Sequence, residues 1–517
     1  MAAKSVLALA LAFVGLVGAQ FDPNFATGRN TITHLFEWRW NDIAEECERF
    51  LGPYGYGGVQ TSSANENAVI DDPPRPWWER YQPVSYQLIT RSGNEEEFAS
   101  MVRRCNAANV RIYVDVILNH MTDSHRIGFG TGGSFYNAPE MAYPEYSAAD
   151  FNARSKCSSA SGSIEDWADT NQVRNCDFGL LRDLDQSQTY VRDHLVEYLN
   201  KLVNYGVAGF RVDAAKCMWP SELKEIFDRL NNLPTEHGFA PNSRPFIYQE
   251  TPDQGPKEQE PIPGDEYFGS GRTIEFRVGR YLGERFRKGM YPIKDLVNWG
   301  SDWGMYPDNY AVVFIDNHDN QRGHVGGGDY TLTFRQSRPY KMASAFMLAH
   351  PYGVTRVMSS FYWEERLEDN GNDANNWIGP PMNANGEIDP VIINPDLTCG
   401  NGWICEHRWR PIYNLVKFRN VVAGTSLTDW WDNGNNQIAF CRGNKGFIAI
   451  NNENFSLNAN LQTCLPAGEY CDVYTGDKQG NACTGRSVIV GSDGRADIFV
   501  TNETEDPVLA LHVEARL

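Results

Sequence analysis

The sequence predicts an α/β protein built on a parallel (β/α)₈ barrel, with a subdomain inserted after the third strand and a C-terminal antiparallel β-sandwich of Greek-key type. Three observations predict this fold. Short apolar runs alternate with helical patterns along most of the chain. A long stretch rich in Gly, Ser, Asn and aromatic residues interrupts the alternation once. Near the C-terminus the apolar runs become short, and turn signals separate them.

Eight apolar runs predict the barrel strands. They are Thr31–Phe36, Gly57–Thr61, Val110–Leu118, Val207–Val212, Phe246–Gln249, Thr273–Phe276, Ala311–Ile315 and Val354–Met358. Helical patterns accompany them at Trp40–Leu51, Glu95–Ala108, Tyr190–Tyr205, Ser337–Leu348 and Glu406–Val422, and a further helix is expected to begin near Pro220.

The pattern divides the mature chain into three domains, which suits its length of 517 residues. The barrel takes residues 20–118 and 184–424. The insertion takes residues 119–183, because a structureless loop of that length would be improbable. The sandwich takes residues 425–517, and its expected strands are Gln437–Cys441, Gly446–Asn451, Ser487–Val490, Asp497–Val500 and Val508–Val513.

The N-terminus predicts secretion. Residues 1–19 contain Lys4, an apolar run over Val6–Val17 and small residues before Gln20, which is the pattern of a signal peptide. No later apolar run is long enough to span a bilayer. The formal net charge of −20 disfavours nucleic acid and anionic membrane surfaces as partners, because both require a concentrated positive face. We therefore expect a secreted, extracellular protein.

Eleven cysteines in an oxidising compartment predict five disulfides and one free thiol. Short spacing favours three pairs, which are Cys157–Cys176, Cys399–Cys405 and Cys471–Cys483. Spacing alone leaves the pairing of the other four open; these are Cys47, Cys105, Cys441 and Cys464. Cys217 is the candidate for the free thiol.

Carboxylates follow several of the predicted strands. Asp213 ends the fourth strand between Arg211 and Lys216, two cations that would keep it ionised and able to act as a nucleophile. For one isolated Asp, a structural ion pair is the more common explanation. Glu250 and Asp319 follow the fifth and seventh strands, however, and strand ends of a (β/α)₈ barrel meet on one rim.

Three carboxylates on one rim suit the cleavage of a glycosidic bond. One attacks the sugar carbon, one protonates the leaving oxygen and one stabilises the oxocarbenium-like charge. Asp213 fits the nucleophile. Glu250 is the better proton donor, because it follows apolar Phe246 and Ile247, which favour the neutral acid.

Four segments of the chain resemble the signature regions of the α-amylase family. They are Asp115–His120, Gly209–Pro220, Phe246–Glu250 and Phe314–Asp319. The stretches His34–Trp40, Trp77–Gln82 and Cys399–Trp409 are similar to the animal, chloride-dependent members, and the resemblance runs from Gln20 to the C-terminus. It implies retaining endo-hydrolysis of α-1,4-glucosidic bonds, with Asp213 as nucleophile, Glu250 as general acid/base and Asp319 as transition-state stabiliser.

The resemblance also implies the substrate contacts and the partners. The matching substrate-binding positions are Trp77, Trp78, Tyr81, Gln82, His120, Arg211, Lys216, His318 and His324. The implied substrates are starch, glycogen and malto-oligosaccharides, bound by a monomer. Stacking of sugar faces on aromatic rings agrees with this, although a pair such as Trp77-Trp78 is more often buried core.

Two ion sites are implied by the family. Calcium would be held by the Asn119 side chain, the Asp183 carboxylate and the backbone carbonyls of Arg174 and Cys217. Taken alone, Asn119 and Asp183 would be ordinary turn or capping residues. Chloride would be held by Arg211, Asn317 and Arg356.

The chain departs from the family at its cysteines. Cys217 stands where the family usually has His, and it is interpreted as a small buried thiol or, alternatively, as a thiolate stabilised by Lys216 and calcium. Cys441 and Cys464 stand where vertebrate members usually lack Cys, so they are paired here, which leaves Cys47–Cys105. Two Cys common in vertebrate insertions are absent, which indicates an invertebrate branch.

The sequence also carries two weaker features. The glycine-rich stretch Gly323–Gly328 resembles the family's mobile loop over the cleft. Asn454 and Asn502 begin Asn-X-Ser/Thr motifs, which are candidate glycosylation sites.

Two other functions remain open from the sequence. An α-glucosidase or a transglycosylase would use the same three carboxylates, although the animal-type C-terminal region and the chloride residues argue against both. A binding protein that has lost catalysis would show a replaced carboxylate, whereas Asp213, Glu250 and Asp319 are all present.

Overall fold

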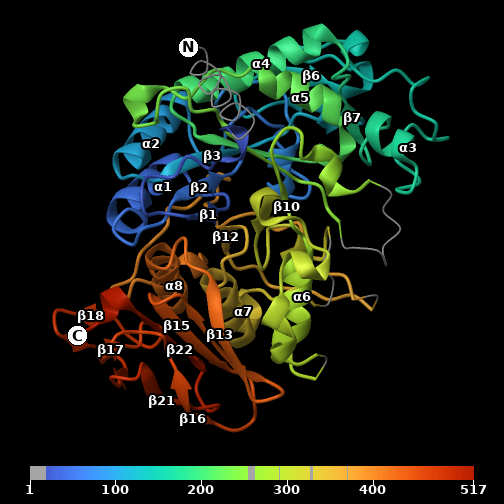
Figure 1. The fold of residues 1–517 in the computed structure, drawn as a ribbon. Helices are drawn as coiled ribbons and strands as arrows, with labels where there is room; N and C mark the ends of the chain where they lie inside the picture. The colour runs from blue at the N-terminus through green and yellow to red at the C-terminus, as the bar shows by residue number, and fades with distance from the viewer. Residues whose placement is uncertain (1–18, 254–261, 290, 326–329, 370) are drawn as a thin grey trace, which may run out of the picture.

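The computed structural model describes residues 19–253, 262–289, 291–325, 330–369 and 371–517 (Figure 1). Residues 1–18 of the expected signal peptide and the glycines 326–328 of the expected mobile loop lie outside the described residues.

Eight parallel strands form a closed barrel, which confirms the predicted fold class. Their order around the barrel is β1-β12-β11-β10-β9-β8-β3-β2. Barrel strands that follow one another along the chain are therefore neighbours in the barrel, and the first strand, β1, pairs with the last, β12, to close it. The strands are β1 (Thr31–Leu35), β2 (Gly58–Thr61), β3 (Arg111–Val116), β8 (Gly209–Val212), β9 (Phe246–Gln249), β10 (Arg272–Ile274), β11 (Ala311–Val313) and β12 (Val354–Ser359). All of these strands except β9 and β12 are shorter than predicted, and β3 differs most, since it spans Arg111–Val116 where Val110–Leu118 was expected.

Helices surround the barrel (Figure 1). They are α1 (Trp40–Glu46), α2 (Glu95–Ala107), α4 (Thr189–Asn204), α5 (Pro220–Asp228), α6 (Arg277–Phe286), α7 (Ser337–Ala349) and α8 (Arg410–Val421). Local sequence explains several helix starts. Asn94 and Glu97 form a capping box at the start of α2, and Pro220 is the first residue of α5. The predicted helix Trp40–Leu51 continues beyond α1 as a π-helical turn, η2 (Cys47–Leu51).

The insertion leaves the barrel directly after β3. Its elements are β4 (His120–Asp123), β5 (Ile127–Phe129), β6 (Phe135–Asn137), α3 (Thr170–Asn175) and β7 (Leu181–Asp183). β4 and β7 pair antiparallel, so the segment that leaves the barrel and the segment that returns to it lie side by side. The insertion therefore covers the carboxyl end of the barrel.

The C-terminal region is an antiparallel β-sandwich, drawn in orange and red in Figure 1. One layer is a four-stranded sheet of β13 (Leu427–Asp432), β14 (Gln437–Arg442), β15 (Gly446–Asn451) and β22 (Val508–His512). The second layer contains β16 (Leu457–Gln462), β17 (Gly468–Cys471), β20 (Ser487–Val490) and β21 (Arg495–Val500), and a two-stranded ribbon joins β18 (Lys478–Gln479) to β19 (Ala482–Cys483).

Three strands of the four-stranded sheet, β14, β15 and β22, are buried on both faces, whereas β13 is partly exposed. Ile438 and Phe440 of β14 belong to the core that is continuous with the barrel, whereas Ala439 and Cys441 belong to the core between the two layers. Arg442 reinforces the contact with the barrel by donating to the carbonyl of Ala349, the last residue of α7. The sandwich is thus packed against the barrel through one face of this sheet.

Five strands of the C-terminal region were not predicted from the sequence: β13, β16 and β17 of the two layers, and the short β18 and β19 of the ribbon. β16 has the sequence Leu-Asn-Ala-Asn-Leu-Gln, and asparagine is depleted in strands. Its alternate residues Leu457 and Leu461 nevertheless point into the core between the layers.

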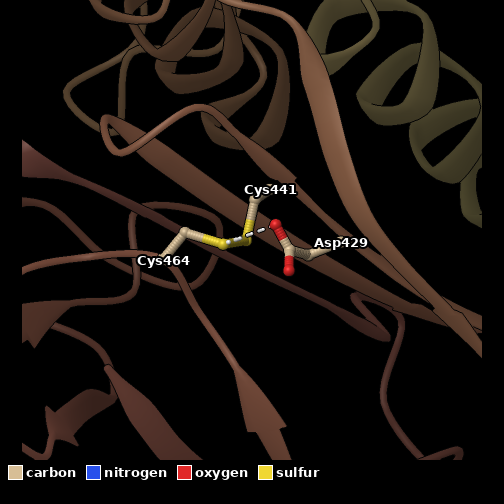
Figure 2. Close-up of side chains that lie close together, drawn as sticks. All are labelled: Asp429, Cys441 and Cys464. Carbon is tan, nitrogen blue, oxygen red and sulfur yellow. Dashed lines mark hydrogen bonds between the residues drawn. A yellow bond between two sulfur atoms is a disulfide. The ribbon is translucent and has the colours of Figure 1, made fainter. Parts of the chain in front are cut away.

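All five predicted disulfides are present, and Cys217 is the free, buried thiol. Figure 2 shows the Cys441–Cys464 disulfide with the Asp429 carboxylate 3.2 Å from Cys464 Sγ. The two sulfur atoms are bonded to each other, so this group lacks the thiolates that a metal ion would need. Across the described residues, no helix has both the length and the apolar character to cross a membrane.

Candidate active site

The carboxyl ends of the barrel strands and the insertion enclose a cleft of about 550 Å³. Asp213 and Glu250 each follow directly after a strand, and Asp319 lies in the turn that follows β11. The cleft is lined by Trp77, Trp78, Tyr81, His120, Trp167, Phe178, Leu181, Asp213, Ala214, Lys216, Cys217, Glu250, Pro252, Asp319, His324 and Val325. The three predicted catalytic carboxylates therefore share one cleft.

One guanidinium connects the carboxylates. Arg211 Nη1 donates to Asp115 Oδ1 at 2.8 Å and to Asp213 Oδ1 at 2.5 Å, and Nη2 lies 2.7 Å from Glu250 Oε1. Arg211 is only 1% exposed. Together with Asp319, these residues are called the Arg211 cluster below. It contains one cation and four carboxyl groups, so its charges do not balance.

The imbalance changes the acidity of the carboxyl groups. Burial raises the pKa of Asp213 well above its usual range; Arg211 opposes this shift, and the neighbouring Glu250, Asp115 and Asp319 add to it. Burial and Glu250 raise the pKa of Asp319 to about 7. The cluster holds more carboxyl groups than one arginine can neutralise, which favours retention of a proton within it.

Lys216, the second cation next to Asp213 in the sequence, lines the same cleft, and its Nζ donates to the carbonyl of Pro252 at 2.7 Å. Glu250 is oriented from another side, because Ala214 N donates to Glu250 Oε2 at 2.9 Å. Ala214 adopts a left-handed conformation with φ of 45°, which is strained for a residue with a Cβ. The turn after β8 thus helps to hold the expected proton donor.

A chain of polar contacts joins Asp319 to the rest of the cluster. His318 Nε2 lies 3.1 Å from Asp319 Oδ2 and 2.9 Å from the Tyr81 hydroxyl, which donates to Asp115 Oδ2 at 2.9 Å. Burial lowers the pKa of His318 well below its usual range and that of His120 to about 4, so both imidazoles are neutral near pH 7. His120 contacts the backbone carbonyl of Tyr81.

The other predicted substrate residues divide into two groups. Trp77, Trp78 and Tyr81 belong to the short 3₁₀-helix η3 (Trp77–Tyr81) and line the cleft, as do His120, Lys216 and His324. Gln82, Arg211 and His318 lie behind the lining and are nearly fully buried. The Gln82 side chain accepts a hydrogen bond from Asp123 N, at the end of β4.

Several residues of the site were not predicted from the sequence. Trp167, Phe178 and Leu181 bring the insertion into the cleft, and Trp167 is 44% exposed with its ring edge against Phe178. No spacing signal identifies them, because all three lie in the insertion, away from the carboxyl ends of the barrel strands. Asp115 carried a signal, since it lies within a signature segment, but its contact with Arg211 follows only from the pairing of β3 with β8.

The residues expected to bind calcium fit that ion. Asn119 Oδ1 is buried and, within the described part of the chain, has no hydrogen-bond partner. Asp183 is buried too, its pKa is raised well above the usual range by burial, and the neutral amide of Asn152 donates to it at 2.6 Å. α3, which contains Arg174, packs against η6 (Ala215–Cys217). Oxygen atoms without cationic partners are the donors that calcium requires.

The residues expected to bind chloride also fit. Arg211 Nε and Arg356 Nη2 are buried N–H donors for which the described residues supply no acceptor. Burial and the nearby Arg211 lower the pKa of Arg356. Two buried guanidiniums with unused donors favour an anion between them. In the third member, Asn317, Oδ1 accepts hydrogen bonds from Asp319 N at 3.1 Å and Asn320 N at 2.8 Å, and Nδ2 makes a long contact of 3.4 Å with Asp319 Oδ2.

The environment of Cys217 favours the interpretation as a buried thiol. Burial raises the pKa of the thiol, and the nearby Asp183 and Asp213 raise it further, whereas Lys216 acts weakly in the opposite direction. The alternative of a thiolate stabilised by Lys216 gains no support from this geometry.

Comparison with known proteins agrees with the site. Family models match residues 77–260, as the α-amylase catalytic domain, and residues 428–514, as the α-amylase C-terminal all-β domain. The chain is 54% identical to pancreatic α-amylase of Sus scrofa over 99% of this chain and 100% of the relative, and 52% identical to α-amylase of Oryzias latipes over 98% and 99%.

A solved structure is similar over nearly the whole length. The wild-type α-amylase I of Eisenia fetida superposes with a TM-score of 0.89 at 46% identity, covering 95% of this chain and 98% of that one. A variant of the same earthworm enzyme, solved in complex with maltohexaose, superposes equally well. The chain belongs to the animal α-amylases, a family of glycoside hydrolases.

Proposed function

We propose that this α-amylase cleaves internal α-1,4-glucosidic bonds of starch, glycogen and malto-oligosaccharides with retention of configuration, and that its role is digestive. The observation that supports the proposal is the convergence of Asp213, Glu250 and Asp319, from three different strand ends, on one aromatic-lined cleft. Asp213 and Glu250 both contact the Arg211 guanidinium, which agrees with the short carboxyl separation of retaining enzymes.

The reaction would proceed in two balanced steps. Asp213 attacks the anomeric carbon while Glu250 gives its proton to the departing glycosidic oxygen, and a glycosyl ester forms. Glu250 then takes a proton from water, whose oxygen displaces Asp213 and restores both carboxyl groups. Asp319 would stabilise the positive charge that develops on the sugar ring. Trp77, Trp78 and Tyr81 would position the glucose units by stacking.

Calcium and chloride are proposed as cofactors. Asn119, Asp183 and the carbonyls of Arg174 and Cys217 would hold calcium, which would tie the insertion to the barrel. Arg211, Asn317 and Arg356 would hold chloride, and a bound anion would supply negative charge close to Glu250 and favour its protonated form.

We further propose that the protein is a secreted, extracellular monomer with the domain boundaries predicted from the sequence. Its five disulfides support an oxidising compartment. The continuous core between the barrel and the sandwich supports a structural role for residues 425–517.

A reducing-end assay on soluble starch, with calcium and chloride varied independently, tests the proposal. We expect viscosity to fall before much glucose appears, and activity to require both ions. Release of glucose without loss of viscosity would indicate an α-glucosidase, and formation of new linkages would indicate a transglycosylase. Unchanged activity and pH optimum after exhaustive halide removal would refute the chloride site.

A further inference from the structure

The aromatic face of the cleft rests on a very short element. η3 contains five residues, and its capping backbone hydrogen bonds run from Glu79 N to the Pro76 carbonyl and from Gln82 N to the Glu79 carbonyl. A single 3₁₀ turn is not stable by itself, because few backbone bonds offset the ordering of its residues. Other contacts must therefore fix the position of Trp77, Trp78 and Tyr81.

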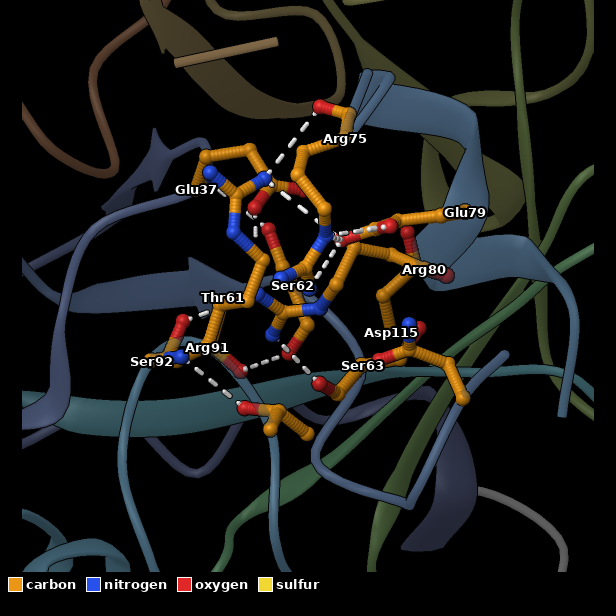
Figure 3. Close-up of polar contacts among 12 residues, drawn as sticks. Glu37, Thr61, Ser62, Ser63, Arg75, Glu79, Arg80, Arg91, Ser92 and Asp115 are labelled. Carbon is orange, nitrogen blue, oxygen red and sulfur yellow. Dashed lines mark hydrogen bonds and ion pairs between the residues drawn. The ribbon is translucent and has the colours of Figure 1, made fainter. Parts of the chain in front are cut away.

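The side chains of Glu79 and Arg80 make these contacts with the polar and charged residues around them (Figure 3). Glu79 is 0% exposed and Arg80 is 1% exposed, and neither lines the cleft. The five residues thus present aromatic rings to one side and buried charges to the other.

Arg80 joins η3 to the ends of the first two barrel strands. Its Nη1 donates to Glu37 Oε2 at 3.0 Å and to Ser92 Oγ at 2.9 Å, and its Nη2 donates to the Ser63 carbonyl at 2.7 Å. Glu37 is fixed in turn, because its backbone N donates to Ser62 Oγ at 2.9 Å. Glu37 also has φ of 66°, a conformation that a residue with a side chain adopts only when its surroundings hold it.

Glu79 joins η3 to the loops around it. Arg75 donates to Glu79 through Nε at 2.9 Å and Nη2 at 2.8 Å, and Arg91 Nη1 lies 3.5 Å from the same carboxylate. Arg91 also donates to the carbonyls of Arg75 and Gly386. Glu37, Arg75, Glu79, Arg80 and Arg91 are called the anchor cluster below.

We infer that the anchor cluster positions the aromatic sugar-binding face, and that Glu37 and Arg80 are positioning residues that act on substrate affinity through η3. This rests on the proposed function, since it assigns to Trp77, Trp78 and Tyr81 the binding of glucan. Loss of one anchor would let η3 shift, and the stacking contacts would weaken. Among the described contacts of η3, the hydrogen bond from the Tyr81 hydroxyl to Asp115 is the one that reaches the Arg211 cluster, so the chemical step would be less affected than binding.

The test compares Glu37→Gln and Arg80→Lys with the wild type on maltoheptaose and on soluble starch. Gln keeps the shape of Glu37 without its charge, and Lys keeps the charge of Arg80 without its planar fork. We expect KM to rise about tenfold while kcat changes by less than about threefold, because small displacements of binding groups cost at least that much. Affinity for maltoheptaose, measured by tryptophan fluorescence in a Glu250→Gln background, should fall by the same factor.

The matched control is Glu48→Gln, which removes an exposed carboxylate that pairs with Arg104 at 2.6 Å on the outside of the barrel. It should leave KM and kcat unchanged. Wild-type KM in both folded anchor variants, or equal losses in kcat and affinity, would overturn the inference. If Glu37→Gln does not fold, Arg80→Lys alone decides. A wild type inactive on starch would instead refute the proposed function.

Discussion

Two buried clusters of charges lie at the same rim of the barrel, and they differ in their balance. The Arg211 cluster sets one guanidinium against four carboxyl groups, whereas the anchor cluster sets three guanidiniums against two carboxylates. Burial raises the pKa of Glu37 as well, but Arg80 and Arg91 oppose that effect. An excess of buried carboxyl groups favours retention of a proton that can be transferred, whereas a surplus of paired guanidiniums fixes the positions of the side chains around them. Four predictions test this difference, from the largest effect to the smallest.

Glu250→Gln should remove the proposed proton donor of the Arg211 cluster. We expect kcat on starch to fall by a factor on the order of 10²–10⁴, the usual contribution of general acid–base catalysis, with maltoheptaose binding retained. A reducing-end assay and a fluorescence titration measure the two effects. Glu225→Gln, which removes a half-exposed partner of Arg192, serves as the control and should be as active as the wild type. Full activity of Glu250→Gln would contradict the assignment of the proton donor.

Arg80→Met should break the anchor cluster and leave Glu37 buried without its partner. Removing one member of a buried ion pair costs about 3–5 kcal/mol, and we expect the free energy of unfolding to fall by this amount in urea titrations. The double variant Glu37→Gln with Arg80→Met should recover part of the loss, since no unpaired charge is then buried. A loss below about 1 kcal/mol in the single variant would show that this buried pair stabilises the protein no more than an exposed ion pair does.

Glu406→Gln should change the pH dependence of stability. Glu406 and Asp316 are buried and bridged through Ser360 and Gln321. Burial and the nearby Asp316 raise the pKa of Glu406 to about 8, and burial raises that of Asp316 to about 7. A raised folded-state pKa stabilises the protein at low pH, and this stabilisation is lost as the pH rises towards 8.

Relative to the variant, the wild type should therefore lose about 2–3 kcal/mol between pH 5.5 and 7.5, because each pH unit changes the free energy of unfolding by about 1.4 kcal/mol per retained proton. Urea titrations of both proteins at the two pH values measure the difference. A pH-independent difference would show that Glu406 is ionised in the folded protein.

Glu48→Gln should change stability by less than about 0.5 kcal/mol, because its pair with Arg104 is exposed to solvent. Thermal unfolding at low and moderate salt measures the effect. A loss comparable to that of Arg80→Met would show that burial does not distinguish the two kinds of ion pair.

Much of the fold and of the site could be predicted from the sequence. Apolar runs identified all eight barrel strands, because buried parallel strands are nearly continuous apolar stretches. The signature segments identified Asp213, Glu250 and Asp319, and the cleft contains all three. The missed strand β16 shows the limit, since its asparagines hide the alternation that buries Leu457 and Leu461.

The sequence by itself determined the barrel, the cysteine pairs at short spacing and the chemistry of the strand ends, because periodicity and local motifs express these features within a few residues. Only the tertiary structure decided which charges are buried together. Glu37 meets Arg80 across 43 positions, and Asp115 meets Arg211 across 96. Such contacts depend on strand order and on burial. Desolvation shifts the pKa values of the charged groups and strengthens the interactions between them, and it arises only once the chain is folded.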